Sequence, residues 1–233
     1  MAYDLKDESE VKEYIENLGI EYRFGCYQEK KPDVCHLLGD YLEGIKKDFE
    51  KACKVYKANC DYNNFSKSCY KFANYSVLGK GLNKSDTEEA FKYYEKACSL
   101  GDPDACLNGG LISINSGPHC RKVKDYTAGM AMLDKCCEKN KAYCCFYLSG
   151  MYISGVEQVQ IKQDMEKAYQ YALKGCELGD MHACANVSQM YRKGEGVAKN
   201  EELAEKYKKK AHEIQENHRL KAQLQFQQGV NPV

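Results

Sequence analysis

The chain has 233 residues, of which 43% are hydrophobic and 29% are charged, with 34 basic and 34 acidic side chains. A formal net charge of zero argues against a nucleic-acid-binding protein, because neutralising phosphates requires a basic surplus. No stretch approaches about 18 consecutive apolar residues, so we expect no membrane span. The composition predicts a soluble, folded and mostly helical protein, and its unusual feature is fourteen cysteines.

The N-terminal segment MAYDLKDESEVKEY is acidic and polar. It therefore resembles neither a secretory signal peptide nor an arginine-rich mitochondrial presequence. Disulfide bonds persist in oxidising compartments, so the cysteine content indicates such a compartment. The N-terminal segment, in contrast, does not resemble a signal for entering one. Two interpretations remain open: the cysteines stay reduced in the cytosol, or the chain enters the mitochondrial intermembrane space, where oxidation itself traps it.

Ten of the cysteines form a repeat along the chain. Each pair has an internal spacing of eight or nine residues, and the second members recur every 34 to 39 residues. This period is typical of stacked helical hairpins. The flanking text repeats as well, as in EKACSLGDPDACLNGG and LKGCELGDMHACANVSQMY. In chain order the pairs are Cys26 and Cys35, Cys60 and Cys69, Cys98 and Cys106, Cys137 and Cys145, and Cys176 and Cys184.

Helical periodicity fills the segments between these pairs. One apolar stripe follows the spacing i, i+3, i+4, i+7 and i+11 at Phe49, Ala52, Cys53, Tyr56 and Cys60. Similar stripes cover residues 90–98, 168–176 and 184–191. The triplets Gly79-Lys80-Gly81 and Gly194-Glu195-Gly196 are interpreted as helix ends. They lack the preceding strand and the longer glycine pattern of a phosphate-binding loop.

Geometry decides how the paired cysteines can meet. On one continuous helix, eight residues span about 12 Å, whereas a disulfide needs Cα atoms closer than about 7 Å. The pairs can therefore bridge only across a turn, which the LGDP and LGDM segments supply. Closing each ring of roughly nine residues stabilises the fold by about 2.5 kcal/mol. We expect one structural disulfide per hairpin.

Metal and redox motifs are weak in this sequence. There is no C-x-x-C motif. Four thiolate ligands for one zinc ion could come only from the two adjacent pairs Cys136-Cys137 and Cys144-Cys145. No catalytic constellation or nucleotide-binding pattern stands out. We therefore assign no catalytic and no metal-binding residues.

The C-terminal repeat ACANVSQMYRKGEGVAKNEELAEKYKKKA resembles a Sel1-like repeat. Cysteine pairs across its hairpins are typical of the cysteine-rich branch, and the segment DYLEGIKKDFEKACKVYKANC is similar to a family of cytochrome c oxidase assembly factors within it. This resemblance covers roughly residues 8–215. It implies an all-α, right-handed α/α solenoid of about five tetratricopeptide-like hairpins in residues 1–215, preceded by a short helix. Residues 216–233 are expected to be a polar, glutamine-rich, mobile tail.

The resemblance also implies a function. It predicts a non-enzymatic, monomeric protein of the mitochondrial intermembrane space, imported through the oxidative disulfide relay, that binds client proteins during assembly of cytochrome c oxidase (complex IV). The alternatives are a haem-binding thiol–disulfide oxidoreductase of the same compartment and a general protein-interaction adaptor. No cofactor is required for the first interpretation. Where the family has unpaired cysteines, this chain has Tyr22, Tyr93 and Tyr169, which weakens any haem or redox role resting on those thiols.

Four cysteines without a repeat partner are candidate free or redox thiols. Cys53 belongs to an apolar stripe and is expected to be buried and inert. Cys136 and Cys144 replace small residues of the other repeats, which favours two small buried thiols. Their spacing of eight leaves a sixth bridge open as the alternative. Cys120 lies in the insertion SGPHCRKVKD, whose basic neighbours would favour a thiolate, so a reactive or haem-ligating thiol is the alternative to an ordinary loop cysteine.

A structural role is the favoured interpretation for the histidines and tyrosines. His36 and His182 adjoin the hairpin cysteines, and His212 and His218 belong to a basic segment that we interpret as a final capping helix. Binding of that segment to an acidic surface is the alternative. The repeated tyrosines are expected to lie in the core, with a tyrosine-lined groove as the alternative: Tyr56, Tyr94, Tyr152 and Tyr191.

Overall fold

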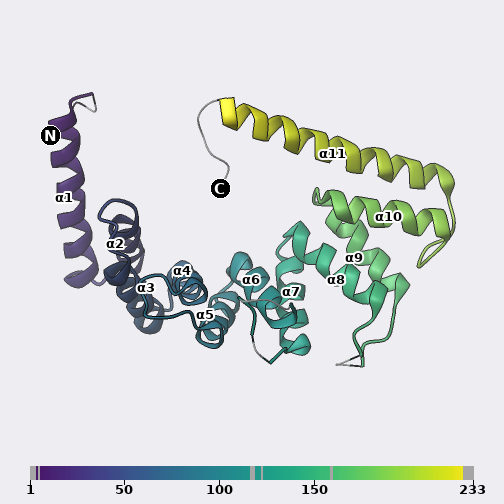
Figure 1. Ribbon diagram of the computed structural model, residues 1–233, viewed down its shortest axis with the longest axis horizontal. Coiled ribbons are helices and arrows are strands. Elements are labelled where there is room, and N and C mark those ends of the chain that lie inside the picture. The colour runs from purple at the N-terminus through teal and green to yellow at the C-terminus, as the bar shows by residue number, and fades with distance from the viewer. Residues whose placement is uncertain (1–3, 5, 116–118, 122, 158–159, 228–233) are drawn as a thin grey trace. The chain divides into compact units, whose positions relative to one another are not determined.

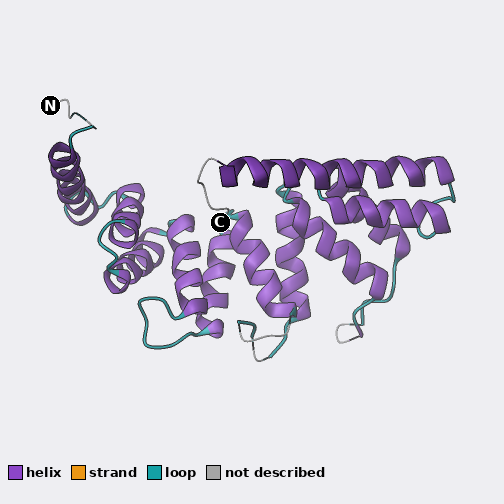
Figure 2. Ribbon diagram, turned by 45° about the horizontal axis from the view of Figure 1, so that its top comes forward, coloured by secondary structure: helices purple, strands orange, loops and turns teal. Residues whose placement is uncertain are grey.

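The computed structural model describes residues 4, 6–115, 119–121, 123–157 and 160–227 (Figures 1 and 2). In this part of the chain the secondary structure is helical apart from an isolated bridge between Val156 and Ile161. The helices are α1 (Glu8–Tyr27), α2 (Pro32–Gly44), α3 (Phe49–Asn63), α4 (Ser66–Leu78), α5 (Thr87–Ser99), α6 (Pro103–Ile114), α7 (Tyr126–Glu138), α8 (Ala142–Ser154), α9 (Met165–Glu177), α10 (Met181–Lys193) and α11 (Glu201–Gln227).

The chain divides into two compact units, residues 1–124 and 125–233. The first unit contains the hairpins α1–α2, α3–α4 and α5–α6, and the second contains α7–α8, α9–α10 and the final helix α11. Within each unit, the first helix of a hairpin packs on the preceding hairpin's second helix, as α3 does on α2 and α9 on α8. The predicted all-α solenoid of five hairpins is confirmed.

Both ends differ from the expected description. No separate short helix precedes the first hairpin among the described residues, because α1 is itself the first helix of that hairpin. At the other end, α11 lies alongside α10 and continues past it (Figures 1 and 2). It runs through the predicted boundary at residue 215 as far as Gln227. Residues 228–233 of the predicted tail lie outside the described residues, and its mobility stays a prediction.

An aspartate sets the start of the first helix in every hairpin. The N-cap carboxylate accepts hydrogen bonds from backbone N–H groups of the first turn, which have no partner within the helix. Asn200 caps α11 in the same way, accepting from the Leu203 N–H at 2.9 Å. Each repeat therefore carries an aspartate that caps the start of its first helix. The five aspartates are Asp7, Asp48, Asp86, Asp125 and Asp164.

A residue with positive φ reverses the chain inside every hairpin. The left-handed backbone suits glycine and is tolerated by asparagine. It appears at Lys30, Asn64, Gly101, Asn140 and Gly179, with φ between 52° and 95°. This reversal brings the end of one helix against the start of the next, where the paired cysteines lie.

The second glycine of each G-x-G triplet has a packing role. Gly79 and Gly194 are left-handed caps of α4 and α10. A Cβ on Gly196 would overlap the carbonyl oxygen of Met165 at the start of α9, and one on Gly81 would overlap that of Phe49 at the start of α3. In these two hairpins, the loop that leaves the second helix thus closes over the start of the first helix, and a residue with a side chain at the second glycine would prevent this.

Each unit has its own core. In the first unit it includes Leu38, Cys53, Tyr56 and Phe72, all at most 1% exposed. In the second it is built from small residues of α9 and α10 against Val187 and Met190. The tyrosines expected in the core are buried at positions 56, 94 and 191, whereas Tyr152 is half-buried. Among the described residues, no helix is both long and apolar enough to cross a membrane.

Candidate functional site: disulfide-linked hairpins and their grooves

The structure joins the two cysteines of every predicted pair across the hairpin turn. The Cα–Cα distances are 4.5 to 4.9 Å, well inside the range that a disulfide requires. The bridges lie inside the hairpins: Cys60, Cys69, Cys145, Cys176 and Cys184 have no exposed surface. Each of these bridges therefore joins two helices where their Cα atoms lie less than 5 Å apart.

Cys136 and Cys144 are also joined, with Cα atoms 5.8 Å apart. This differs from the favoured interpretation of two unpaired thiols and agrees with the alternative of a sixth bridge. The reason is visible in the hairpin α9–α10, where Gly175 and Ala183 occupy the equivalent positions. A Cβ on Gly175 would lie 2.9 Å from that of Ala183, so these positions are in close contact. Two cysteines placed there lie within reach of each other.

Two thiols remain unpaired, and their surroundings differ. Cys53 is 1% exposed in the core of the first unit, and burial raises its pKa to about 11, so the reactive thiolate is disfavoured. Cys120 is half-buried in the loop between α6 and α7, next to Arg121. Lys122, its other basic neighbour, lies outside the described residues. The oxidoreductase alternative therefore depends on Cys120.

Alkylation of the native, unreduced protein is expected to label Cys120 alone, because Cys53 is buried and the other twelve cysteines are bridged. Unfolding in urea without reductant should expose Cys53 and raise the number of labels to two. Reduction should raise it to fourteen. Intact-mass spectrometry with peptide mapping measures all three states, and label on Cys136 or Cys144 before reduction would contradict the sixth bridge.

A network of charged and aromatic groups links α2, α3 and α4. The buried Tyr56 donates its hydroxyl proton to Asp40 (2.6 Å) and lies 3.2 Å from Glu43. Lys71 and Lys80 donate to Glu43 at 2.9 and 2.7 Å. Burial raises the pKa of Glu43, but these two ammonium groups outweigh it and hold the pKa at about 2.

Acid titration should detect this network. Because the pKa of Glu43 is about 2 in the folded chain and has an ordinary value of 4.5, its contribution to stability is complete above pH 4.5. That contribution is lost as the pH falls towards 2. Glu43→Gln is expected to lower the free energy of unfolding at pH 7 and to flatten its dependence on pH in this window. Urea titrations of both proteins at several pH values measure this, and parallel pH profiles would contradict it.

His36 belongs to the same region and is used structurally. Its Nδ1 lies 3.0 Å from the Ser68 hydroxyl, and its ring contacts Tyr56 and Phe65. Burial lowers the pKa of His36, although the carboxylate of Asp40, 3.7 Å from Nε2, opposes this. The imidazole connects α2 to α4 and is enclosed by aromatic rings.

The three tyrosines that were expected at cysteine positions of the family are engaged in packing. Tyr93 donates to Asp61 at 2.8 Å and accepts a hydrogen bond from Lys57, whose ammonium lies 4.5 Å from the Tyr93 ring centroid. The hydroxyl of Tyr169 is hydrogen-bonded to that of Tyr191 at 2.6 Å. Tyr22 packs edge-on against Tyr41. These positions offer no thiol for haem, and their hydroxyls or rings are already occupied, so we derive no haem chemistry from them.

Two histidines that are far apart in the sequence line one groove in the second unit. The groove lies between α10 and α11, has a volume of about 340 Å³, and includes His182, Arg192, Lys208 and His212. Arg192 and Lys208 are paired with glutamates of α11, Glu205 among them. Across the described residues, no group of three or more histidine, cysteine or acidic side chains is arranged to hold a metal ion.

Comparison with known proteins identifies the repeat. The model of the Sel1 repeat family matches residues 32–54, 66–102, 142–180 and 182–211. The cytochrome c oxidase assembly factor 7 homolog of Drosophila melanogaster is 51% identical over 99% of this chain and 98% of the relative. The chain belongs to the cytochrome c oxidase assembly factor 7 family of Sel1 repeat proteins. Cytochrome c oxidase assembly factor 7 of Homo sapiens is 38% identical over 99% of this chain and 96% of its own length.

Solved structures share the fold of this family. A Sel1 repeat protein from Oxalobacter formigenes has a TM-score of 0.63 at 26% identity, covering 85% of this chain and 84% of that one. A protective antigen of uropathogenic Escherichia coli has a TM-score of 0.72 at 19% identity, covering 82% of this chain and 40% of that one. The second likeness concerns the fold alone.

Proposed function

We propose that this chain acts in the assembly of cytochrome c oxidase in mitochondria, as a non-enzymatic scaffold that binds client proteins. The observation that carries the proposal is the 51% identity over nearly the full length of both chains with the fly cytochrome c oxidase assembly factor 7 homolog. The helical-repeat fold supports it, because stacked hairpins offer extended surfaces and grooves to protein partners.

Replacement of the fly homolog tests this function. Drosophila cells depleted of that protein would express this chain, and assembled cytochrome c oxidase would be measured on native gels together with oxidase activity. We expect both to be restored. A Cys120→Ser variant serves as the matched control, and it should restore the oxidase equally if the unpaired thiol has no part in assembly. The proposal would be contradicted if the chain accumulates in mitochondria with its disulfides formed but does not restore assembled cytochrome c oxidase.

The intermembrane space is the compartment we propose within mitochondria. Twelve bridged cysteines support an oxidising environment, since disulfides are rare in reducing compartments. Import with retention through the oxidative disulfide relay follows from the same argument. Protease should spare the chain in intact mitochondria and digest it once the outer membrane is ruptured. Protection that persists after rupture would place it in the matrix and contradict this part of the proposal.

A further inference from the structure

The helix α1 exposes three large apolar side chains on one face. Ile20, Phe24 and Tyr27 are 57%, 58% and 57% exposed. Their spacing of four and three residues places them one above the other along the helix. We call these three residues the α1 stripe. α1 packs on α2 through other positions, including the buried Gly19 and Cys26.

The repeat itself does not require this stripe. Counted from the hairpin cysteine, the three residues occupy positions −6, −2 and +1 of the first helix. The equivalent positions of α3, α5, α7 and α9 hold charged, polar or alanine residues and no large apolar one. They are Lys54, Ala58 and Asp61; Lys92, Lys96 and Ser99; Ala131, Lys135 and Glu138; and Gln170, Lys174 and Glu177. The fold is thus compatible with polar residues there, and the apolar residues of α1 need another explanation.

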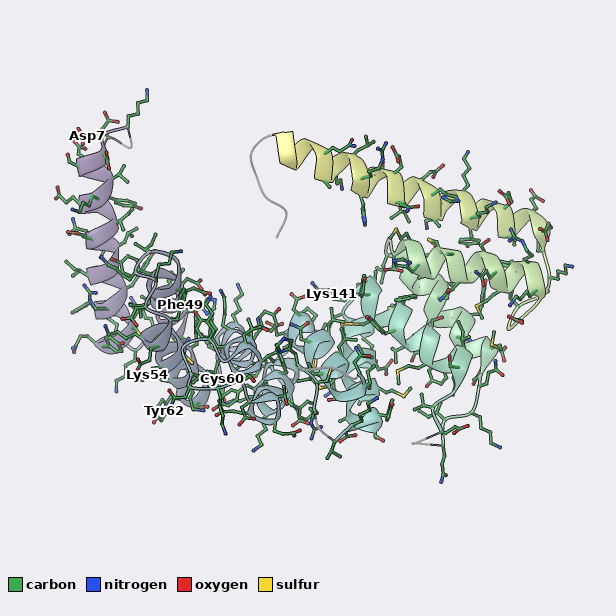
Figure 3. All side chains as sticks on the ribbon, in the orientation of Figure 1. Asp7, Phe49, Lys54, Cys60, Tyr62 and Lys141 are labelled. Atoms are coloured by element: carbon green, nitrogen blue, oxygen red, sulfur yellow. A yellow bond between two sulfur atoms is a disulfide. The ribbon has the colours of Figure 1, made fainter. Side chains whose placement is uncertain are left out.

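The stripe continues into a groove. Tyr27 and Tyr62 both line a groove of about 430 Å³ that lies over the Cys26–Cys35 bridge, with Val55 on its wall. Tyr62 is 85% exposed and lies at the end of α3 (Figure 3). Contiguous exposed aromatic groups of this kind are typical of surfaces that bind other proteins.

Acidic residues extend the same face towards the N-terminus. Glu16 and Glu13 precede Ile20 by four and seven residues, and both are exposed. The helix carries five glutamates against two basic residues, Lys12 and Arg23. Lys30, on the groove wall, is the basic group at the other end. A complementary ligand therefore presents apolar groups to the stripe and positive charge to the glutamates.

We propose that the α1 stripe and its groove bind a basic amphipathic helix of a partner protein. Apolar side chains at i, i+4 and i+7 of that helix cover Ile20, Phe24 and Tyr27, and its lysines or arginines face Glu13 and Glu16. This inference does not depend on the role in oxidase assembly.

Fluorescence anisotropy of the full chain tests the inference. The probe is a labelled synthetic helix of about 18 residues, roughly five turns, with leucines on one face and lysines and arginines on the other. The variant I20K/F24K/Y27E carries residues that the other first helices tolerate, and we expect it to bind the probe at least about tenfold more weakly. E13Q/E16Q should weaken binding severalfold and reduce its salt dependence. Leu78→Lys, which removes an exposed apolar side chain of α4, should bind like the wild type.

Several outcomes would overturn the proposal. One is no binding of the probe to the wild type, and another is unchanged binding to the triple variant. A probe with glutamates in place of its basic residues should not bind. If the acidic and the basic probe bind equally well, charge complementarity with Glu13 and Glu16 plays no part in binding. If sedimentation shows a dimer that the triple variant abolishes, the stripe binds a second copy of this chain instead. Circular dichroism melting checks that the triple variant folds, and Phe24→Lys alone provides a milder second variant.

Discussion

Replacing both Cys60 and Cys69 with alanine is expected to lower the free energy of unfolding by about 3 kcal/mol. The bridge closes a small ring in the unfolded chain, which reduces that chain's entropy. Both side chains are fully buried, so two small cavities add to the loss. Alanine avoids placing a hydroxyl group in the core. Urea unfolding monitored by circular dichroism, under non-reducing conditions, measures the difference.

Cys120→Ser is the matched control for this measurement, because it also removes a thiol but breaks no bridge. Its effect should stay within about 0.5 kcal/mol. An equal effect of the double replacement and the control would mean that the bridge adds nothing to stability. By the same reasoning, a strong reductant should destabilise the wild type far more than any single pair of replacements does.

Gly196→Ala is expected to destabilise the chain by about 3 kcal/mol or more, although it adds one methyl group. Two effects combine. The backbone φ of 73° strains any residue with a Cβ, at about 1 to 2 kcal/mol. The new Cβ would also overlap the carbonyl oxygen of Met165, a backbone atom that cannot move without displacing the start of α9. Urea unfolding again measures the loss.

Gly101→Ala separates the two effects. Gly101 has a φ of 95° but open space around its missing Cβ, so only the strain of about 1 to 2 kcal/mol is expected. If the two variants lose equal stability, the close approach of the loop to α9 is not a packing constraint. Gly81→Ala should behave like Gly196→Ala, because its Cβ would meet the Phe49 carbonyl in the same way.

The sequence predicted the features that depend on local chemistry. The helix ends at Gly79 and Gly194 follow from the G-x-G triplets. The hairpin disulfides follow from a spacing of eight or nine residues across a turn. These signals are short-range and repeat at a constant period, so a pattern in one hairpin supports the same interpretation in the next.

Features that depend on distances between helices could not be predicted in this way. The bond between Cys136 and Cys144 requires the close contact that Gly175 and Ala183 reveal in another hairpin. His182 and His212 line the same groove only because α11 packs on α10. Sequence periodicity placed Glu43 in no site, because its pKa is set by lysines that lie 28 and 37 residues away.

The sequence by itself determined the repeat, the helix ends marked by glycine and the pairing of ten cysteines, because turns and short-range bridges are encoded within a few residues. Which of the equivalent positions in the repeated hairpins are buried was decided by the tertiary structure alone. Ile20, Phe24 and Tyr27 belong to an ordinary helical pattern in the sequence, and only the packing of α1 on α2 through the opposite face shows them to be exposed. Burial depends on neighbours far along the chain, and that is the information a local pattern lacks.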